Sequence, residues 1–301
     1  MGHDLYEAFP AARAIFDEAD TTLGFTLSDL CFRGPGDELT ATQNAQPALL
    51  TMSVAVLAAL GWKQDGNTTV SAPAAPHFVA GHSLGEYSAL VAAGSLDFAT
   101  ALRLVRRRGE LMAAASDGTM AAVIGLDLEP LRQICKQAST LGAVVIANEN
   151  APGQLVISGT GEAVARAGDL AKAAGASRVL PLKVSAAFHS PLMLDAAEGL
   201  REALERAVVR PAVVPVVANV TAQPLTSPAE IRAELIDQIT APVKWIASIE
   251  YMARAGVDRF VEIGPGTVLS GLVRRIAPAA VRLSVGDVAG VTTMQGDAHA
   301  D

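Results

Sequence analysis

The sequence predicts an α/β protein in which a small domain interrupts a larger one. Apolar runs typical of strands alternate with helical stretches over most of the 301 residues, which favours helices layered on a sheet. Between residues 118 and 186 the predicted order is β-α-β-β-α-β, the order of a split βαβ unit. Half of the residues are hydrophobic, enough for the core of one large domain or two moderate ones.

Composition and charge exclude several classes of protein. No window reaches the roughly 18 apolar residues that a membrane span needs, and the first residues lack the basic and apolar regions of a signal peptide. A formal net charge of −8 argues against a nucleic-acid surface. The two cysteines, Cys31 and Cys135, have neither a disulfide framework nor a metal-binding spacing. We therefore expect no metal, a reducing cytoplasmic setting and, by default, a monomer.

The first part of the chain predicts helices, one strand and two more helices. Pro10 divides an apolar helical stripe into two helices. A buried helix over 44–60 has a proline in its first turn and a glycine just past its end. The remaining elements are a loop at 71–76, a strand at 77–80 and helices at 84–93 and 98–115.

The middle of the chain predicts a separate small subdomain with a ferredoxin-like order of elements. Polar and glycine residues at 148–153 predict a turn between its two central strands. The expected elements are strands at 120–124, 143–147, 154–158 and 178–182 and helices at 130–140 and 162–174.

The last part of the chain returns to the large subdomain. Its expected elements are a helix at 192–208, a strand at 213–219, helices starting near 228 and 243, a strand at 259–263, a helix ending near 276 and a strand at 281–285. The end of the chain is small and polar, so we expect it to be frayed. The predicted domains are 1–117 with 187–287, the insertion 118–186 and a disordered tail 288–301.

The pentapeptide Gly-His-Ser-Leu-Gly at 81–85 lies between a predicted strand and helix. In that context Gly-x-Ser-x-Gly is typical of a nucleophile elbow, a tight turn that exposes the serine hydroxyl. Glycines at both flanks would let strand and helix approach closely. The N–H of Leu84, at the start of the helix, is placed to donate to an oxyanion. Ser83 is the candidate nucleophile, although a turn with a capping serine also fits.

A serine nucleophile needs a base, usually histidine. Two of the five histidines lie near the chain ends, His77 begins the strand below the elbow, and His82 is expected to point away from Ser83. His189 remains as the favoured base, although a helix-start residue also fits its position. Neither Asp195 nor Glu262 stands out as the acid that would orient it, so a backbone carbonyl is the alternative.

A cluster of arginines follows the elbow on the helix predicted at 98–115. Most such clusters form a solvated face. Arg108, however, lies four residues after Leu104 and four before Met112, on an apolar stripe. We expect Arg108 to point inward, where a guanidinium suits a substrate that carries a carboxylate.

Several segments together resemble the malonyl-CoA:acyl carrier protein transacylase family. They are Gln46-Pro-Ala-Leu, Gly-His-Ser-Leu-Gly-Glu-Tyr-Ser-Ala-Leu at 81–90, Arg103-Leu-Val-x-x-Arg108-Gly, Ala187-Phe-His-Ser190 and Glu262-Ile-Gly-Pro-Gly266. The resemblance runs from Met1 to about Val285. It implies a large α/β-hydrolase-like subdomain with a ferredoxin-like insertion, in agreement with the pattern of predicted elements.

The resemblance also implies roles for the candidate residues. Ser83 would take the malonyl group from malonyl-CoA as an ester, with His189 as base and then acid. Arg108 would hold the malonyl carboxylate, and the Leu84 N–H would bind the oxyanion. The substrate would be malonyl-CoA, the partner an acyl carrier protein, and no cofactor would be needed. The Leu84 and Phe188 positions look like those of malonyl-selecting members.

Further residues are implied at the pocket or its rim. Asn148 and Asn150 match an Asn-x-Asn pattern of family members, and they are equally good turn formers. His82, Gln46 and Met112 are also candidates.

Other parts of the family pattern bear on the histidine and on the start of the chain. Members orient their histidine with a main-chain carbonyl from the segment that matches 242–245, where many have Gln in place of Lys244. Members also begin with an apolar strand and a Gly-Gln-Gly-x-Gln loop that supplies a second oxyanion amide, and Met1 aligns just downstream. We expect the native start to lie upstream; a lost oxyanion donor costs about a hundredfold in rate.

Three functions remain open on the sequence. The leading one is malonyl transfer to a carrier protein in fatty-acid or polyketide synthesis. A hydrolase that removes acyl groups from carrier proteins and an inactive module that docks them are the alternatives. Because carrier proteins of this kind are acidic, a local basic patch is implied, formed by Arg106 and Arg107 or by Arg274 and Arg275.

Overall fold

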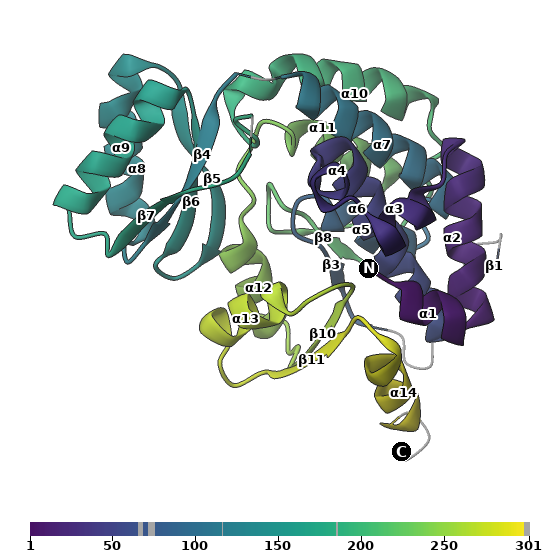
Figure 1. Ribbon diagram of the computed structural model, residues 1–301. Helices are drawn as coiled ribbons and strands as arrows, with labels where there is room; N and C mark the ends of the chain where they lie inside the picture. Colours follow the sequence, from purple (N-terminus) through teal and green to yellow (C-terminus); the bar gives the residue numbers. More distant parts are fainter. Residues whose placement is uncertain (66–68, 72–75, 116, 185, 298–301) are drawn as a thin grey trace.

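A small sheet at the centre of the larger subdomain positions the predicted elbow. The computed structural model describes residues 1–65, 69–71, 76–115, 117–184 and 186–297 (Figure 1). Strand β3 (Val79–Ala80) pairs in parallel with β8 (Val216–Val217), which pairs antiparallel with β9 (Pro224–Leu225). Both β3 and β8 are shorter than the strands predicted at 77–80 and 213–219, although the predicted positions hold.

Helices surround this sheet and form the main hydrophobic core with it. Pro10 starts a second helix, as predicted, and the helix predicted over 44–60 forms and is buried over most of its length. Another short antiparallel pair, β1 (Lys63–Asp65) and β2 (Thr69–Ser71), follows it. The helices are α1 (His3–Ala8), α2 (Pro10–Leu23), α3 (Leu27–Arg33), α4 (Gly36–Thr40), α5 (Thr42–Ala59), α6 (Gly85–Ala92), α7 (Phe98–Ala114), α10 (Leu194–Arg206) and α11 (Pro228–Asp237).

The inserted subdomain has its own sheet and its own core. Its strands lie in the order β5-β6-β4-β7, with antiparallel pairing throughout. Two helices cover one face of the sheet (Figure 1). The predicted ferredoxin-like order is confirmed; the domain boundaries stay a prediction. The elements are β4 (Thr119–Ile124), α8 (Leu128–Ala138), β5 (Val144–Ala151), β6 (Gln154–Gly159), α9 (Gly161–Ala173) and β7 (Arg178–Pro181).

The turn predicted at 148–153 is wrong for most of its length. Strand β5 continues to Ala151, with register shifts against β6 on the way. The larger subdomain supplies the reason, because Val243 donates to the Ala147 carbonyl and accepts from the Glu149 N–H, both at 2.9 Å. These bonds satisfy a backbone that the local sequence would otherwise turn. Asn148 and Asn150 therefore lie on a strand where the two subdomains meet.

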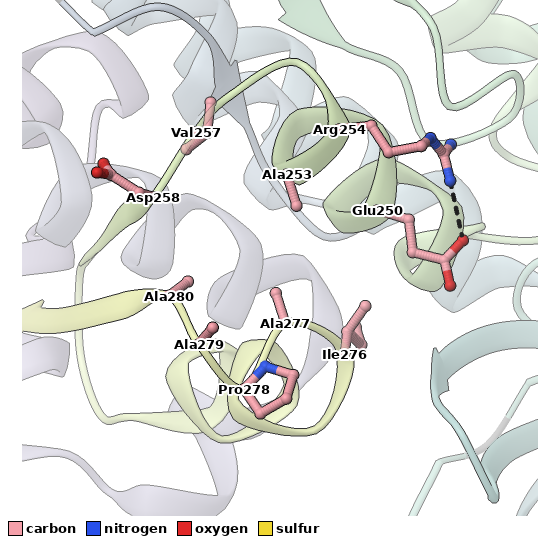
Figure 2. A pocket seen from close by; sticks show the side chains of 10 residues that line it. All are labelled: Glu250, Ala253, Arg254, Val257, Asp258, Ile276, Ala277, Pro278, Ala279 and Ala280. Atoms are coloured by element: carbon pink, nitrogen blue, oxygen red, sulfur yellow. Dashed lines mark ion pairs between the residues drawn. The ribbon is translucent and has the colours of Figure 1, made fainter.

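The last elements form a third, smaller cluster. Strands β10 (Arg259–Ile263) and β11 (Val281–Val285) pair in parallel, next to helices α12 (Trp245–Arg254) and α13 (Val268–Ile276). Figure 2 shows a hollow between the end of α12 and the segment after α13, with Arg254 and Glu250 joined by an ion pair of 3.6 Å. None of the predicted site residues lines this hollow.

The expectation of a disordered tail is wrong for residues 288–297, which form helix α14 (Val288–Asp297). Its Val291 is fully buried in the main core. The Val288 N–H donates to Asp4, and the Gln295 side chain donates to the Ala59 carbonyl. Packing against the first helices stabilises a segment whose small, polar composition favours fraying. Among the described residues, no helix is long and apolar enough to cross a membrane.

Candidate active site

The elbow is a strained turn held by hydrogen bonds on both sides of Ser83. Ser83 has a positive φ of 51°, a conformation that costs a non-glycine residue energy unless its surroundings enforce it. Asn219, just beyond β8, provides that restraint. Its side-chain oxygen accepts from the Ser83 N–H at 2.7 Å, and its side-chain nitrogen donates to the Gly81 carbonyl at 2.7 Å.

The two glycines of the motif do not share one role. A Cβ on Gly81 would lie 1.9 Å from the carbonyl carbon and oxygen of Gly85, so only glycine fits there. A Cβ on Gly85 would have no neighbour within 4 Å. The expectation that both glycines permit the close approach is therefore wrong for Gly85.

Ser83 and His189 meet although 106 residues separate them. The Ser83 Oγ and the His189 Nε2 lie 2.7 Å apart, and the His189 Nδ1 lies 2.8 Å from the Gln238 carbonyl oxygen. A carbonyl only accepts, so Nδ1 carries the proton and Nε2 is free to accept from the serine hydroxyl. A backbone carbonyl thus orients the histidine, but it belongs to Gln238 and not to the segment 242–245.

His189 is held in its neutral form by its surroundings. It is 4% exposed, and its backbone also has a positive φ, of 56°. Burial, and next the charge of Arg108, lower the pKa of His189 to about 3. A neutral imidazole is the form that accepts a proton.

Arg108 points inward, as expected from its place on the apolar stripe of α7. Its guanidinium donates to the Ser83 Oγ at 3.1 Å, to the Gln46 Oε1 at 2.7 Å and to the Gln238 Oε1 at 3.0 Å. The side chain is 2% exposed. Within the described ranges it forms no ion pair with an acidic side chain. A buried cation held by neutral amides is suited to bind an anion from outside.

The remaining predicted residues fall into two groups around this centre. Gln46 bonds Arg108 and lies 3.6 Å from the Met112 sulfur. His82 lies against the small subdomain, with its Nε2 2.7 Å from the Asn150 Oδ1. Asn148 is buried on β5. Leu84 is the N-cap residue of α6, so its N–H precedes the helix's own hydrogen bonds.

Three residues of the site were missed by the sequence analysis. Gln238 is fully buried and follows α11, and no local signal distinguishes it. Asn219 is the last residue of the valine-rich strand predicted at 213–219. A polar residue at the end of that strand could have indicated a site residue. Glu86 is an acid on the first turn of a mostly apolar helix, and it is 1% exposed. Glu262, considered as the acid, instead accepts from the Leu269 and Ser270 N–H groups.

A serine on a strand–helix turn, hydrogen-bonded to a buried histidine from a distant segment, is the site of a serine-dependent acyl-transfer enzyme on an α/β fold. Residues 1–299 match the acyl transferase domain family. The chain therefore belongs to that family.

The matches to named relatives cover nearly all of the chain. The malonyl CoA-acyl carrier protein transacylase of Bacillus subtilis is 50% identical over 291 residues, 95% of this chain and 89% of that protein. The acyl-carrier-protein S-malonyltransferase of Bartonella henselae superposes with a TM-score of 0.93 at 42% identity, covering 99% of this chain and 95% of the other. A malonyl-transacylase in complex with its type II polyketide acyl-carrier protein has a TM-score of 0.92 at 43% identity, over 99% and 94%.

The asymmetry of the glycines predicts unequal effects of substitution. We expect Gly81→Ala to lower the free energy of unfolding by about 3 kcal/mol or more, because backbone atoms would have to move. Gly85→Ala is expected to be neutral or to stabilise by up to about 1 kcal/mol, since alanine favours a helix. Urea unfolding of both variants measures the difference. Equal effects would contradict the conclusion that only Gly81 is required by the close backbone contact.

The low pKa of His189 predicts acid-dependent stability. In the unfolded chain histidine binds a proton below about pH 6.5, whereas in the folded chain it stays neutral down to about pH 3. The stability due to neutral His189 is therefore present above pH 6.5 and is lost as the pH falls. Between pH 7 and pH 5 the loss is about 2 kcal/mol.

Urea unfolding at both pH values, with His189→Gln as the matched variant, checks this expectation. The variant should lose less stability on acidification than the unaltered protein. Equal losses in the two proteins would show that His189 does not titrate in this way.

Proposed function

We propose that this chain transfers the malonyl group of malonyl-CoA to the phosphopantetheine thiol of an acyl carrier protein, through a malonyl ester on Ser83. The arrangement that carries the proposal is the contact of one hydroxyl, the Ser83 Oγ, with both His189 and the unpaired cation of Arg108. The named relatives support the substrate, and the solved complex of a relative with its acyl-carrier protein supports the partner.

In the first half of the proposed reaction, the Ser83 Oγ attacks the thioester carbonyl while the His189 Nε2 takes the hydroxyl proton. The N–H of Leu84 donates to the oxyanion of the tetrahedral intermediate. The carbon–sulfur bond then breaks, and the departing coenzyme A sulfur receives the proton from His189. A malonyl ester on Ser83 remains.

In the second half the carrier thiol replaces coenzyme A. His189 takes the thiol proton, the sulfur attacks the ester carbonyl, and the proton returns to the Ser83 oxygen as the ester bond breaks. Every group that this cycle needs comes from the chain or from the two thiols, so the proposed reaction requires no cofactor.

Arg108 is the proposed selector of the acyl group. Its buried guanidinium is oriented by amide oxygens that carry no net charge. A malonyl carboxylate would pair with it through charge-assisted hydrogen bonds. An acetyl group would leave the cation buried and unpaired, which costs free energy.

The proposed docking of an acidic carrier protein requires exposed basic side chains. Of the four arginines considered from the sequence, Arg106 and Arg275 are engaged within the chain. Arg106 bonds Glu110 and Asn44, and Arg275 bonds Gln154. Arg275 is exposed as well but is held by its bond to Gln154, so the exposed Arg107 and Arg274 are the better candidates. A monomeric state and a cytoplasmic location stay predictions.

Mass spectrometry after exposure to malonyl-CoA tests the proposed function. We expect the mass of one malonyl group on the peptide that contains Ser83, and none in Ser83→Ala. Addition of a holo acyl carrier protein should move the group to its thiol. Release of free malonate in place of transfer would indicate a hydrolase, and the absence of any adduct would indicate an inactive docking module.

Replacement of Arg108 predicts a change of selectivity. We expect Arg108→Ala to lower the ratio of malonyl to acetyl acylation of Ser83 by about a hundredfold, because a charge-assisted pair is lost. Arg103→Ala, on an exposed position of the same helix, is the matched control and should keep the ratio. An unchanged ratio in Arg108→Ala would contradict the role of this residue.

A further inference from the structure

We propose that Glu86 is a positioning residue whose buried carboxylate sets the orientation of the Gln238 side chain, and through it the hold on Arg108. The expected effect of Glu86 on the choice between malonyl and acetyl groups rests on the proposed function. Glu86 does not touch the Ser83 hydroxyl, so its effect is exerted through Gln238 and Asn219.

Burial of the Glu86 carboxyl group costs free energy of folding, which indicates that this residue has a specific role. It lies three residues after Ser83 on the first turn of α6, among buried apolar residues. Removal of a carboxylate from water is unfavourable unless hydrogen bonds and charges compensate it. Its Oε2 accepts from the Gln238 Nε2, and its Oε1 accepts from the Asn219 N–H at 3.4 Å.

The contact with Gln238 decides which way round that amide lies. The Glu86 Oε2 faces the Gln238 side chain as an acceptor, and an acceptor oxygen selects the NH₂ end of that amide. The same Nε2 also donates to the Ser83 carbonyl at 3.1 Å. The Oε1 end is therefore directed at Arg108, 3.0 Å from its Nη2. If the amide turned over, two sets of N–H donors would face each other.

Gln238 connects this orientation to the rest of the site. Its main-chain carbonyl accepts from His189, and its side chain contacts Arg108 and the Ser83 backbone. Through the Asn219 N–H, Glu86 also contacts the residue that restrains both sides of the elbow. The Glu86 carboxyl group thus contacts both Asn219, which holds the elbow of Ser83, and Gln238, which contacts His189 and Arg108.

A second buried acid provides a matched control. Glu234 on α11 accepts from the Val220 N–H at 2.7 Å and is 5% exposed. Burial, and next the nearby charge of Glu234, raise the pKa of Glu86. Glu234 therefore shares the environment of Glu86, but no hydrogen bond joins it to the Gln238 side chain within the part of the chain that the structure describes.

The experiment compares Glu86→Gln, Glu234→Gln and the unaltered protein in acylation by malonyl-CoA and acetyl-CoA. A glutamine side chain at position 86 has only one acceptor oxygen, so its NH₂ group must face either the Gln238 Nε2 or the Asn219 N–H, and both of these are donors. We expect the ratio of malonyl to acetyl acylation to fall about tenfold in Glu86→Gln and to stay unchanged in Glu234→Gln. Glu86→Asp, which keeps the carboxylate, should recover part of the ratio.

A double-mutant cycle with Arg108→Ala separates positioning from a general loss of stability. If Glu86 acts through Arg108, Glu86→Gln has no further effect on the ratio in the Arg108→Ala background. An equal fall of the ratio in Glu234→Gln, or a full additional fall in the double variant, would overturn the inference.

A crystal structure of Glu86→Gln tests the same inference without any assay. We expect the Gln238 side chain to move away from the Arg108 guanidinium, and unchanged positions of both side chains would overturn the proposal. If the unaltered protein formed no malonyl ester, the proposed function would fail, while this structural result would still decide whether Glu86 positions Gln238.

Discussion

The hydrogen bond from His189 to the Gln238 carbonyl is the constraint on which the rest of the site depends. Because a carbonyl cannot donate, this bond leaves the proton on Nδ1 and directs the Nε2 lone pair at Ser83. The acceptor carries no net charge, so the buried imidazole gains no ion pair that would favour its charged form. Burial and Arg108 then lower its pKa. The backbone contact thus fixes the tautomer and direction of the base, while burial and Arg108 keep it neutral.

Hydrogen bonds from distant segments hold the strained geometry around that pair. Ser83 and His189 both have positive φ values, which persist only where the surrounding structure enforces them. Asn219 restrains the elbow backbone, and the Asn150 amide of the small subdomain contacts His82 within the motif. Backbone bonds between Val243 and β5 join the two subdomains next to these contacts. The insertion therefore supports the elbow directly.

Two errors in the sequence-based expectations have a common physical origin. The turn at 148–153 and the frayed tail were inferred from local composition, and in each case contacts with remote segments override that composition. The two glycines of the motif look equivalent in the sequence, yet only Gly81 lies against the backbone at the start of helix α6. The segment 242–245 was expected to orient the histidine, whereas Gln238, a few residues earlier, does so.

The sequence by itself determined the fold class, the elbow and the inward direction of Arg108, because short-range spacing and helical periodicity encode these features. It reached His189 by elimination among the histidines and by the family resemblance. Only the tertiary structure decided which groups support them. Gln238, Asn219 and Glu86 act through contacts that span more than a hundred residues. A hydrogen bond between remote side chains depends on how helices and strands pack, and no local pattern of residues records that packing.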